Sequence, residues 1–261
     1  MYRPIATQQS CARAWVAAAG ALVQSNSDAY NVVIDVVNPI VHDETDNEII
    51  FLVDSFLRSY ENAYPISTVA NTIFPQSLYD AHGAPEFYEA YHENFDRLTE
   101  TKRWGRYFER ISRHKLLDGT IYNPLQEMIE KLAKQNEARS TYKAAYELAV
   151  YDPLLDRRIL WGGQCLSFLS FKLHPETGLM LTAIYRNHTY ITRLLGNLIG
   201  LGRLLGFVAK ESRLKVGSLT VISTHAEIDT GGWGIVKARE LISEAKHILD
   251  TRCEMKNAGV N

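Results

Sequence analysis

The sequence predicts an α+β fold in which helices cover a mixed β-sheet. Segments with helical periodicity and short runs rich in β-branched residues follow one another along the whole chain. No internal repeat and no linker rich in proline, glycine or serine divides its 261 residues. The composition, 46% hydrophobic and 22% charged, is that of a soluble globular protein. We therefore expect one domain over residues 1–261.

The N-terminal half is predicted to combine several helices with one early strand. A helix is expected over 11–24, and the run NVVIDVV over 31–37 is typical of a strand. Phe74-Pro75 indicates a turn that leads into another helix. The segment 125–135 is predicted to be an amphipathic helix. Seven aromatic residues at helix-like spacings favour an aromatic core face: Phe87, Tyr88, Tyr91, Phe95, Trp104, Tyr107 and Phe108.

The C-terminal half has the clearest pattern. Strands over 166–173 and 179–185, joined by the turn His174 to Gly178, predict a hairpin with Cys165 at its entry. A helix with an almost continuous apolar face follows over 190–208. A buried strand over 218–223 is expected to end at Thr224-His225, before a last helix over 233–249. Four glycines in the apolar helix indicate close approach of another backbone or a ligand: Gly196, Gly200, Gly202 and Gly206.

Composition and charge exclude several classes of protein. The formal net charge of -2 argues against a bulk nucleic-acid binder, although a few local arginines are enough to hold a small anion. The apolar stretch 14–23 is too short to span a membrane and lacks the flanks of a signal peptide, so no membrane partner is expected. Cys11, Cys165 and Cys253 are widely spaced, which indicates a reducing, cytoplasmic compartment and no metal site.

Cys165 is the residue with the most distinctive chemistry. It follows Gly162-Gly163-Gln164, a flexible approach that can expose the sulfur at the mouth of a strand. A thiolate is a strong nucleophile and also leaves well, provided that nearby cations lower its pKa. The alternative is a buried cysteine that packs as a small hydrophobe.

Four positions in a fixed order define a motif over roughly residues 150–230: Cys165, Tyr185-Arg186, Gly196-Asn197 and Thr224-His225. This set resembles the C-terminal half of the thymidylate synthase and pyrimidine-hydroxymethylase superfamily. Three weaker similarities extend toward the N-terminus: Tyr64 to Thr68 (YPIST), Tyr91 to Asn94 (YHEN) and Trp104-Gly105. The resemblance implies that the whole chain is a divergent domain of this family, with a thymidylate synthase-like fold.

The resemblance also implies a reaction and roles for individual residues. Cys165 is expected to attack C6 of a pyrimidine nucleoside monophosphate, so that C5 is methylated or hydroxymethylated with 5,10-methylenetetrahydrofolate as donor. Trp104 stands near the position of the proton-transfer tyrosine. The other implied contacts are Arg186 with the phosphate, Asn197 with the base edge and His225 with a sugar hydroxyl. A homodimer is implied in which Arg139 reaches the partner's phosphate, with Arg157 and Arg158 as alternatives. Asn197 pairs equally well with uracil or cytosine.

Departures from the family pattern leave the reaction open. Gln164-Cys165-Leu166 replaces Pro-Cys-His, Thr189 replaces an aspartate, and Glu227 replaces a sugar-binding tyrosine, which suggests a changed sugar contact. Gln76 is the nearest match to a glutamate that organises proton transfer. The stretch 38–48 is acidic where the family has an arginine-bearing phosphate loop. Two alternatives therefore stand beside the enzyme: a catalytically degenerate nucleotide-binding protein, and a different reaction through a C6 thiolate adduct, such as exchange at C5 or dehalogenation.

Overall fold

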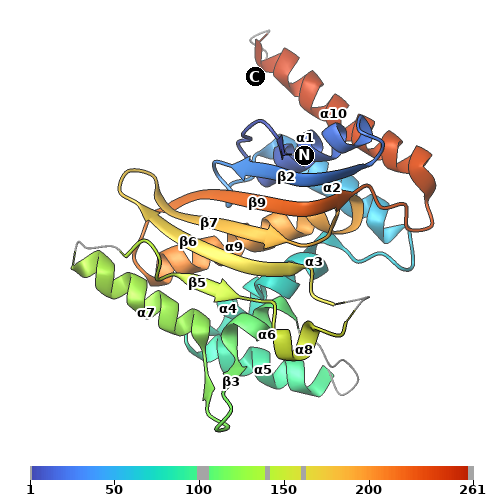
Figure 1. Ribbon diagram of the computed structural model, residues 1–261. Coiled ribbons are helices and arrows are strands. Elements are labelled where there is room, and N and C mark those ends of the chain that lie inside the picture. Colours follow the sequence, from blue (N-terminus) through green and yellow to red (C-terminus); the bar gives the residue numbers. More distant parts are fainter. Residues whose placement is uncertain (1, 99–105, 139–141, 160–162, 258–261) are drawn as a thin grey trace.

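The computed structural model describes residues 2–98, 106–138, 142–159 and 163–257, and these residues form a mixed sheet flanked by helices (Figure 1). The sheet has the order β1-β2-β9-β7-β6-β5, with β8 paired to β9. Neighbouring strands are antiparallel except for β1–β2, β7–β9 and β8–β9. The strands are β1 (Arg3–Pro4), β2 (Asp28–Val36), β5 (Glu147–Ala149), β6 (Leu166–His174), β7 (Gly178–Tyr185), β8 (His188–Thr189) and β9 (Val216–Glu227).

Helices occupy the connections between the strands. They are α1 (Cys11–Val23), α2 (Glu44–Arg58), α3 (Ile66–Ile73), α4 (Gln76–His82), α5 (Glu86–Leu98), α6 (Tyr107–Ser112), α7 (Pro124–Glu137), α8 (Pro153–Asp156), the π-helix η1 (Tyr190–Leu194), α9 (Leu195–Glu211) and α10 (Gly234–Asn257). A separate hairpin joins β3 (His114–Lys115) to β4 (Ile121–Tyr122). The α+β class is confirmed, and the prediction of a single domain over 1–261 stays a prediction.

Strands β6 and β7 form an antiparallel hairpin, as the alternating pattern predicted. The parallel neighbours β7 and β9 are connected through η1 and α9, as parallel pairing requires. The prediction that the next strand ends at Thr224-His225 is wrong, because β9 continues to Glu227. Its last residues are held by pairing with both β2 and β8.

Helix α9 fills the core beneath the sheet, and its glycines allow a close approach. A Cβ at Gly196 would lie 2.6 Å from the Cβ of Val69 in α3, and a Cβ at Gly202 would lie 2.3 Å from the carbonyl oxygen of Pro39. The predicted close contact with another backbone is therefore confirmed. The stretch Tyr190–Glu211 is long and apolar enough to cross a membrane, but 78% of its most apolar window is buried inside the fold, as in the core helix of a globular protein.

The aromatic residues of the N-terminal half form a core cluster, as predicted. Phe87, Tyr88, Tyr91 and Phe108 are buried, and Phe87 packs against Phe207 of α9 at a ring distance of 5.2 Å. Trp104 lies outside the described residues. Helix α7 buries the predicted apolar stripe, which consists of Leu125, Met128, Ile129 and Leu132.

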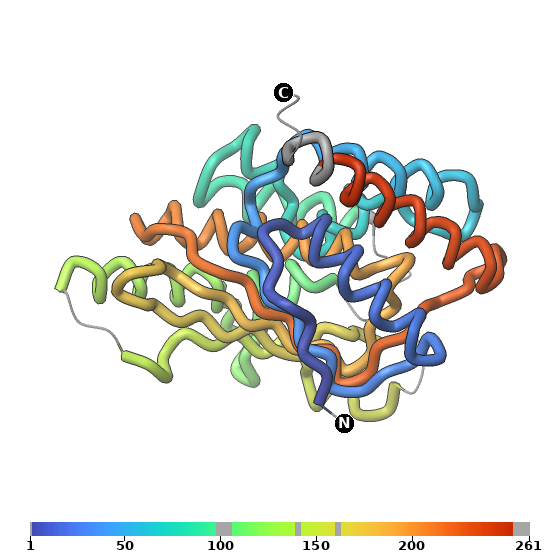
Figure 2. Tube along the Cα trace, turned by 90° about the horizontal axis from the view of Figure 1, so that it is seen from above, coloured from blue at the N-terminus to red at the C-terminus, as the bar shows by residue number. Residues whose placement is uncertain are grey.

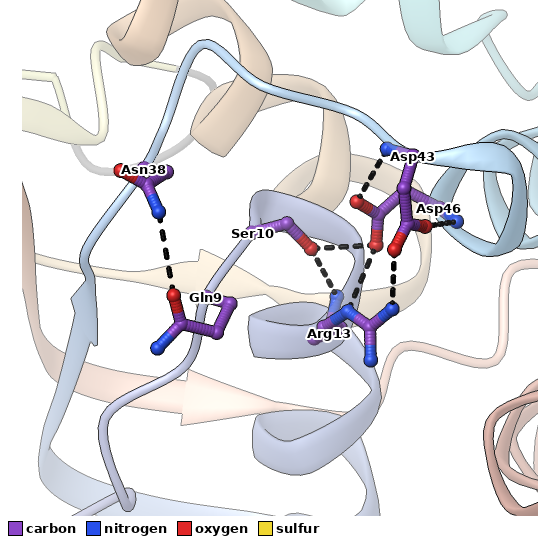
Figure 3. A network of polar contacts seen from close by, with 6 residues as sticks. All are labelled: Gln9, Ser10, Arg13, Asn38, Asp43 and Asp46. Atoms are coloured by element: carbon purple, nitrogen blue, oxygen red, sulfur yellow. Dashed lines mark hydrogen bonds and ion pairs between the residues drawn. The ribbon is translucent and has the colours of Figure 1, made fainter. Parts of the chain in front are cut away.

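The N-termini of α1 and α2 are joined by a polar network (Figure 3). Ser10 caps α1 and donates a hydrogen bond of 2.6 Å to Asp46, while Asp43 and Asp46 form a capping box at the start of α2. Arg13 pairs with both carboxylates, at 2.8 Å from Asp43 and 3.3 Å from Asp46. Much of the negative charge of the stretch 38–48 is thus used to fix one helix against another.

The two faces of the sheet differ. Helices α1, α9 and α10 lie on the same side of the central strands, and the opposite side is largely free of helices (Figure 2). On that open side, four half-buried apolar residues form one row across the paired strands: Val33, Ile222, Ile184 and Phe168. Polar side chains occupy the next row, where Asp35, Thr220, Thr182 and Ser170 are paired in register.

Candidate active site

A cavity of about 540 Å³ lies at the entry of the hairpin, beside Cys165. It has two walls. The cysteine wall consists of Arg106, Tyr107, Gly163, Gln164 and Cys165. The α9 wall is contributed by the segments around α3, β8, η1 and α9, and consists of Tyr64, Thr68, Val69, Thr72, Asn187, His188, Thr189, Arg193 and Asn197.

Cys165 occupies the last position before β6 and is only partly buried. Its carbonyl oxygen accepts a 2.9 Å hydrogen bond from the backbone N–H of Arg186, which fixes it at the end of the hairpin. Burial raises the pKa of the Cys165 thiol above its ordinary value. The positive charges of Arg186 and Arg193 offset part of this rise in pKa, whereas Glu227 adds to it. The sulfur thus faces a cavity and is influenced by two cations.

Three arginines lie near Cys165 or in the lining of its cavity. Arg193 and Arg106 line the cavity, and the guanidinium of Arg193 lies 5.0 Å from the centre of the Tyr64 ring. Arg186 lies just behind the cysteine wall, 5.9 Å from the ring centre of Tyr151. A Cβ at position 163 would meet the Nη2 atom of Arg186 at 2.6 Å, so glycine at 163 makes room for this guanidinium.

Asn197 lies on the α9 wall and is 3% exposed. Its Nδ2 atom is 3.0 Å from Nε2 of His188, and its Oδ1 atom is buried without a hydrogen-bond partner among the described residues. The Nδ1 atom of His188 lies 3.0 Å from the Ser223 hydroxyl, to which the Tyr190 hydroxyl donates at 3.4 Å. Burial lowers the pKa of His188 to about 3, so the imidazole is neutral at pH 7. Asn197 therefore lines the cavity while its amide oxygen is itself buried.

Tyr107 places a phenol in the cysteine wall. Burial raises the pKa of Tyr107 to about 12, and its hydroxyl interacts with the backbone of Cys165 and Leu166. The sequence pattern interpreted this residue only as part of the aromatic core. Tyr107 stands three residues after Trp104, which lies near the expected position of a proton-transfer tyrosine. This short separation in sequence was the signal that pointed to Tyr107.

Two predicted nucleotide contacts lie outside this lining. His225 approaches Asn187 through Nδ1 and Asp28 at 3.0 Å through Nε2. Glu227 accepts a hydrogen bond of 3.4 Å from Asn187. Asn187 itself lines the cavity. His225 and Glu227 are therefore connected to the cavity by their contacts with the Asn187 amide.

Arg157, Arg158 and Gln76 do not line the cavity. Arg139 lies outside the described residues, and Arg157 and Arg158 are exposed at the end of α8. Gln76 donates a hydrogen bond of 2.8 Å to Asp80 and lines a separate hollow of about 370 Å³ with Arg203 and other residues. The expected correspondence of Gln76 with the family's catalytic glutamate is therefore not supported by its position. No residue of the acidic stretch 38–48 is among the described residues that line the Cys165 cavity.

A buried ion pair anchors the segment that leads to Cys165. Arg110 of α6 contacts Asp156 at the end of α8, with 2.9 Å between Nη2 and Oδ1, and also donates to the carbonyl oxygen of Val150 at 3.0 Å. Burial by itself raises the pKa of Asp156, but hydrogen bonds from Arg110 and from the N–H of Asp152 hold it below its usual value. The described residues contain no cluster of three or more His, Cys, Asp or Glu side chains suited to a metal ion.

The structure is that of a mixed α/β protein with a cavity lined by a cysteine, two arginines and an asparagine. No protein-family model matches the chain. A protein of Methanococcoides burtonii named "Putative thymidylate synthase" is 28% identical over 116 residues, which cover 44% of this chain and 50% of that relative. The similarity thus spans about half of the relative's length. It agrees with the resemblance carried by Cys165, Arg186, Asn197 and His225.

Proposed function

We propose that the protein binds a pyrimidine nucleoside monophosphate in the Cys165 cavity and transfers a one-carbon unit to C5 of the base. One observation carries the proposal. Cys165, which is partly buried, lines the same cavity as Arg106, Arg193 and Asn197, and the buried amide oxygen of Asn197 has no hydrogen-bond partner among the described residues. The volume of about 540 Å³ lies within the range of roughly 300–1,000 Å³ that is usual for small-molecule sites.

The cations and the amide divide the recognition between them. Arg193 and Arg106 are suited to the phosphate, because a guanidinium makes short, charge-assisted hydrogen bonds with phosphate oxygens. Asn197 is suited to the base edge, where its amide meets one donor and one acceptor. Asn187, backed by His225 and Glu227, stands where a sugar hydroxyl would be held.

The chemistry begins with addition of the Cys165 thiolate to C6. The C5–C6 double bond opens, its electron pair is delocalised onto the C4 carbonyl oxygen as an enolate, and C5 becomes nucleophilic. After C5 has bonded to the one-carbon unit, loss of the C5 proton would expel the carrier that delivered this unit and leave an exocyclic methylene on C5. Addition of hydride or water to this methylene would then expel the thiolate from C6 and restore the C5–C6 double bond. Tyr107 belongs to the same wall of the cavity, and its hydroxyl interacts with the backbone of Cys165.

The donor that the resemblance implies is 5,10-methylenetetrahydrofolate, which when bound would supply an electrophilic one-carbon unit. The wall formed by Tyr64 and Val69 offers an aromatic and an apolar surface of the kind on which a flat ring stacks. Whether C5 ends as methyl or hydroxymethyl depends on whether hydride or water completes the reaction.

A nucleotide-binding protein without catalysis is the second candidate. It is favoured by the absence of any carboxylate from the described lining of the cavity, because the family uses a glutamate to organise proton transfer. In this case Cys165 would contact the base without completing a turnover.

Product analysis separates the two candidates. The protein is incubated with UMP, dUMP, CMP or dCMP, with and without 5,10-methylenetetrahydrofolate, and the nucleotides are analysed by mass spectrometry. Formation of a 5-methyl or 5-hydroxymethyl nucleotide by wild type but not by Cys165→Ser supports the enzyme. Tight nucleotide binding in calorimetry without any product supports the binding protein, and exchange of the C5 hydrogen in D₂O without folate supports the third reaction.

We also propose a homodimer that packs through the open face of the sheet. The row Val33, Ile222, Ile184 and Phe168 would pair with its copy, while the neighbouring polar row would limit the contact. Light scattering after gel filtration should give twice the chain mass for wild type and a single chain mass for Ile222→Lys. A monomeric wild type at micromolar concentration would contradict this.

A further inference from the structure

The second hollow, of about 370 Å³, is separate from the Cys165 cavity and has a basic lining. Its walls come from the segment 39–42, from α4 and from α9, and none of its described lining residues also lines the Cys165 cavity. Arg203 and Lys210 of α9 supply two positive charges, and Asp80 of α4 is the only carboxylate among the described lining residues. The hollow is therefore a distinct site with its own charge.

Arg203 forms no ion pair with the described residues. It is half-buried, and the hydrogen bond that its guanidinium makes within the described part of the chain runs from Nη1 to the Oδ1 atom of Asn71, at 3.3 Å. Burial lowers the pKa of Arg203, and the charge of Asp80 offsets only part of this fall. A guanidinium carries five N–H donors. Most of the hydrogen-bonding capacity of Arg203 is therefore not used by the described residues.

The other charges of the lining are also not paired with one another. The ammonium of Lys210 is exposed and lies 4.9 Å from the centre of the Tyr79 ring. Asp80 accepts a hydrogen bond of 2.8 Å from Gln76, and Glu211, which is not among the described lining residues, accepts one from the Tyr79 hydroxyl. Within the described lining, two cations thus stand against one carboxylate.

The segment 39–42 is packed closely on α9. The carbonyl oxygen of Pro39 would lie 2.3 Å from a Cβ at Gly202, and the Cγ2 atom of Ile40 would lie 3.3 Å from a Cβ at Gly206. Both approaches depend on glycine, because a side chain at either position would press on the segment. This wall of the hollow is therefore formed by backbone packing that needs no ligand.

The acidic neighbours of His42 are neutralised elsewhere. Burial lowers the pKa of His42, and the charge of Arg203 lowers it as well, whereas Asp46 and Asp43 raise it. These two carboxylates both pair with Arg13 at the junction of α1 and α2 (Figure 3). The acidic stretch 38–48 thus contributes a histidine to the lining, while these carboxylates are bound to another arginine.

We propose that this hollow is a second anion site, in which Arg203 and Lys210 hold the phosphate group of free phosphate or of a small phosphate monoester. A guanidinium makes charge-assisted hydrogen bonds to phosphate oxygens, and an ammonium adds a compact positive charge. Pro39 and Ile40 in the same lining give the organic part of a monoester an apolar surface to contact. Asp80 repels the anion and so limits its affinity. The site goes beyond the proposed function and does not rest on it.

The Nε–H group of Arg203 reports binding directly. Its NMR signal in isotope-labelled protein is assigned as the arginine signal that is lost in Arg203→Gln. At pH 7 a phosphate monoester carries between about 1.5 and 2 negative charges. The protein is titrated with inorganic phosphate, with methyl phosphate, and with chloride at the same ionic strength. We expect a saturable shift with both phosphates that chloride does not reproduce. An equal shift with chloride would overturn the site.

Two changes of charge should act with opposite signs. Asp80→Asn removes the opposing carboxylate and should lower the dissociation constant for phosphate about threefold, whereas Lys210→Gln removes a cation and should raise it by a similar factor. Asp250→Asn and Lys246→Gln are the matched controls, since they remove the same charges from exposed positions of α10, which does not line the hollow. Both controls should keep the wild-type dissociation constant.

Opposite shifts cannot come from a loss of folding, which would weaken binding in both variants. If Asp80→Asn and Lys210→Gln bind phosphate as wild type does, or if the controls shift its affinity equally, the site is overturned. Tighter binding of methyl phosphate than of inorganic phosphate supports a monoester as the ligand, and the reverse order supports the free anion. None of these results needs a nucleotide beside Cys165, so the proposed function stands or fails separately.

Discussion

The two walls of the Cys165 cavity are built on different principles. The α9 wall is formed around a buried helix, and its polar groups are tied together: Asn197, His188, Ser223 and Tyr190 are all nearly inaccessible. The cysteine wall carries a half-buried thiol and the exposed Arg106. It depends on one buried ion pair, Arg110–Asp156, for the position of α8 just upstream.

This difference suits the α9 wall to recognition of the base and the cysteine wall to the reaction. A buried, hydrogen-bonded network suits the reading of a base edge, because unmatched polar groups are costly in a buried site. A thiol that must form and release a bond needs access and nearby cations more than rigidity. We therefore expect changes in the α9 wall to alter selectivity, and changes in the cysteine wall to alter stability near the site and thiol reactivity.

The largest expected effect comes from removing the anchor of the cysteine wall. Asp156→Ala leaves the Arg110 charge buried and unpaired, which should lower the free energy of unfolding by about 3–5 kcal/mol. Urea denaturation measures this loss. Glu93→Gln breaks the exposed pair with Arg97 and should change the free energy of unfolding by less than about 1 kcal/mol. Equal losses of unfolding free energy in the two variants would show that the buried pair contributes no more to stability than the exposed pair does.

The second effect is a pH dependence that belongs to the α9 wall. Because the pKa of His188 is about 3 in the folded protein and about 6.5 when unfolded, the unfolded chain takes up a proton that the folded one does not. Stability is therefore complete above pH 6.5 and falls as the pH drops toward 3. Between pH 7 and pH 5 this amounts to about 2 kcal/mol.

The variant His188→Asn isolates this contribution. Its free energy of unfolding should fall about 2 kcal/mol less than that of wild type over the same interval. His92, whose pKa burial lowers to about 4, adds a similar loss in both proteins and cancels in the comparison. Parallel pH profiles for the two proteins would mean that His188 is not held neutral.

A third test addresses the packing that supports the α9 wall. Gly202→Ala places a methyl group 2.3 Å from the carbonyl oxygen of Pro39, so overpacking should outweigh the gain in helix propensity and cost about 1 kcal/mol net. Gly20→Ala in α1 meets no atom within 4 Å and should instead stabilise the protein by up to about 1 kcal/mol. Thermal unfolding of both variants checks the opposite signs, and stabilisation by both would contradict the close approach.

The smallest expected effect concerns the charge around the sulfur. Arg193→Gln removes a cation that lowers the pKa of Cys165, so the pKa should rise further and alkylation by iodoacetamide at pH 8 should slow by less than about tenfold. The rate is followed at Cys165 by peptide mass mapping. Arg203→Gln, at the separate hollow around Gln76, should leave the rate unchanged. A faster reaction in Arg193→Gln would reverse the assigned influence of this charge.

Local patterns were sufficient for much of the fold. The alternation over 166–185 predicted the β6–β7 hairpin, and the apolar periodicity with its glycines predicted both α9 and its contact with another backbone. These features depend on neighbouring residues and on the absence of a side chain, which a sequence displays directly. The end of β9 was missed because it is determined by pairing with β2 and β8, which are distant in sequence.

The candidate site was harder to predict from the sequence, because it also depends on contacts between residues that are distant in sequence. Cys165 and Asn197 carry recognisable motifs, but Arg193, His188 and Tyr107 reach the cavity only through tertiary packing. Arg193 stands four residues before Asn197, so helical spacing was a signal for it. The expected contact of His225 with a sugar hydroxyl stays a prediction. The structure adds its contact with Asp28 on the paired strand β2, a pairing that the sequence did not predict.

The most direct test of the account is the formation of a covalent bond at Cys165. The protein is incubated with 5-fluoro-uridylate, 5-fluoro-cytidylate and their deoxy forms, with and without 5,10-methylenetetrahydrofolate, and its intact mass is measured. Because fluorine at C5 cannot be lost as a proton is, the addition product should accumulate. We predict a mass increase of one nucleotide, or of a nucleotide plus folate, on Cys165 in wild type and none in Cys165→Ala. Tight binding of these nucleotides without any adduct would contradict the proposed chemistry.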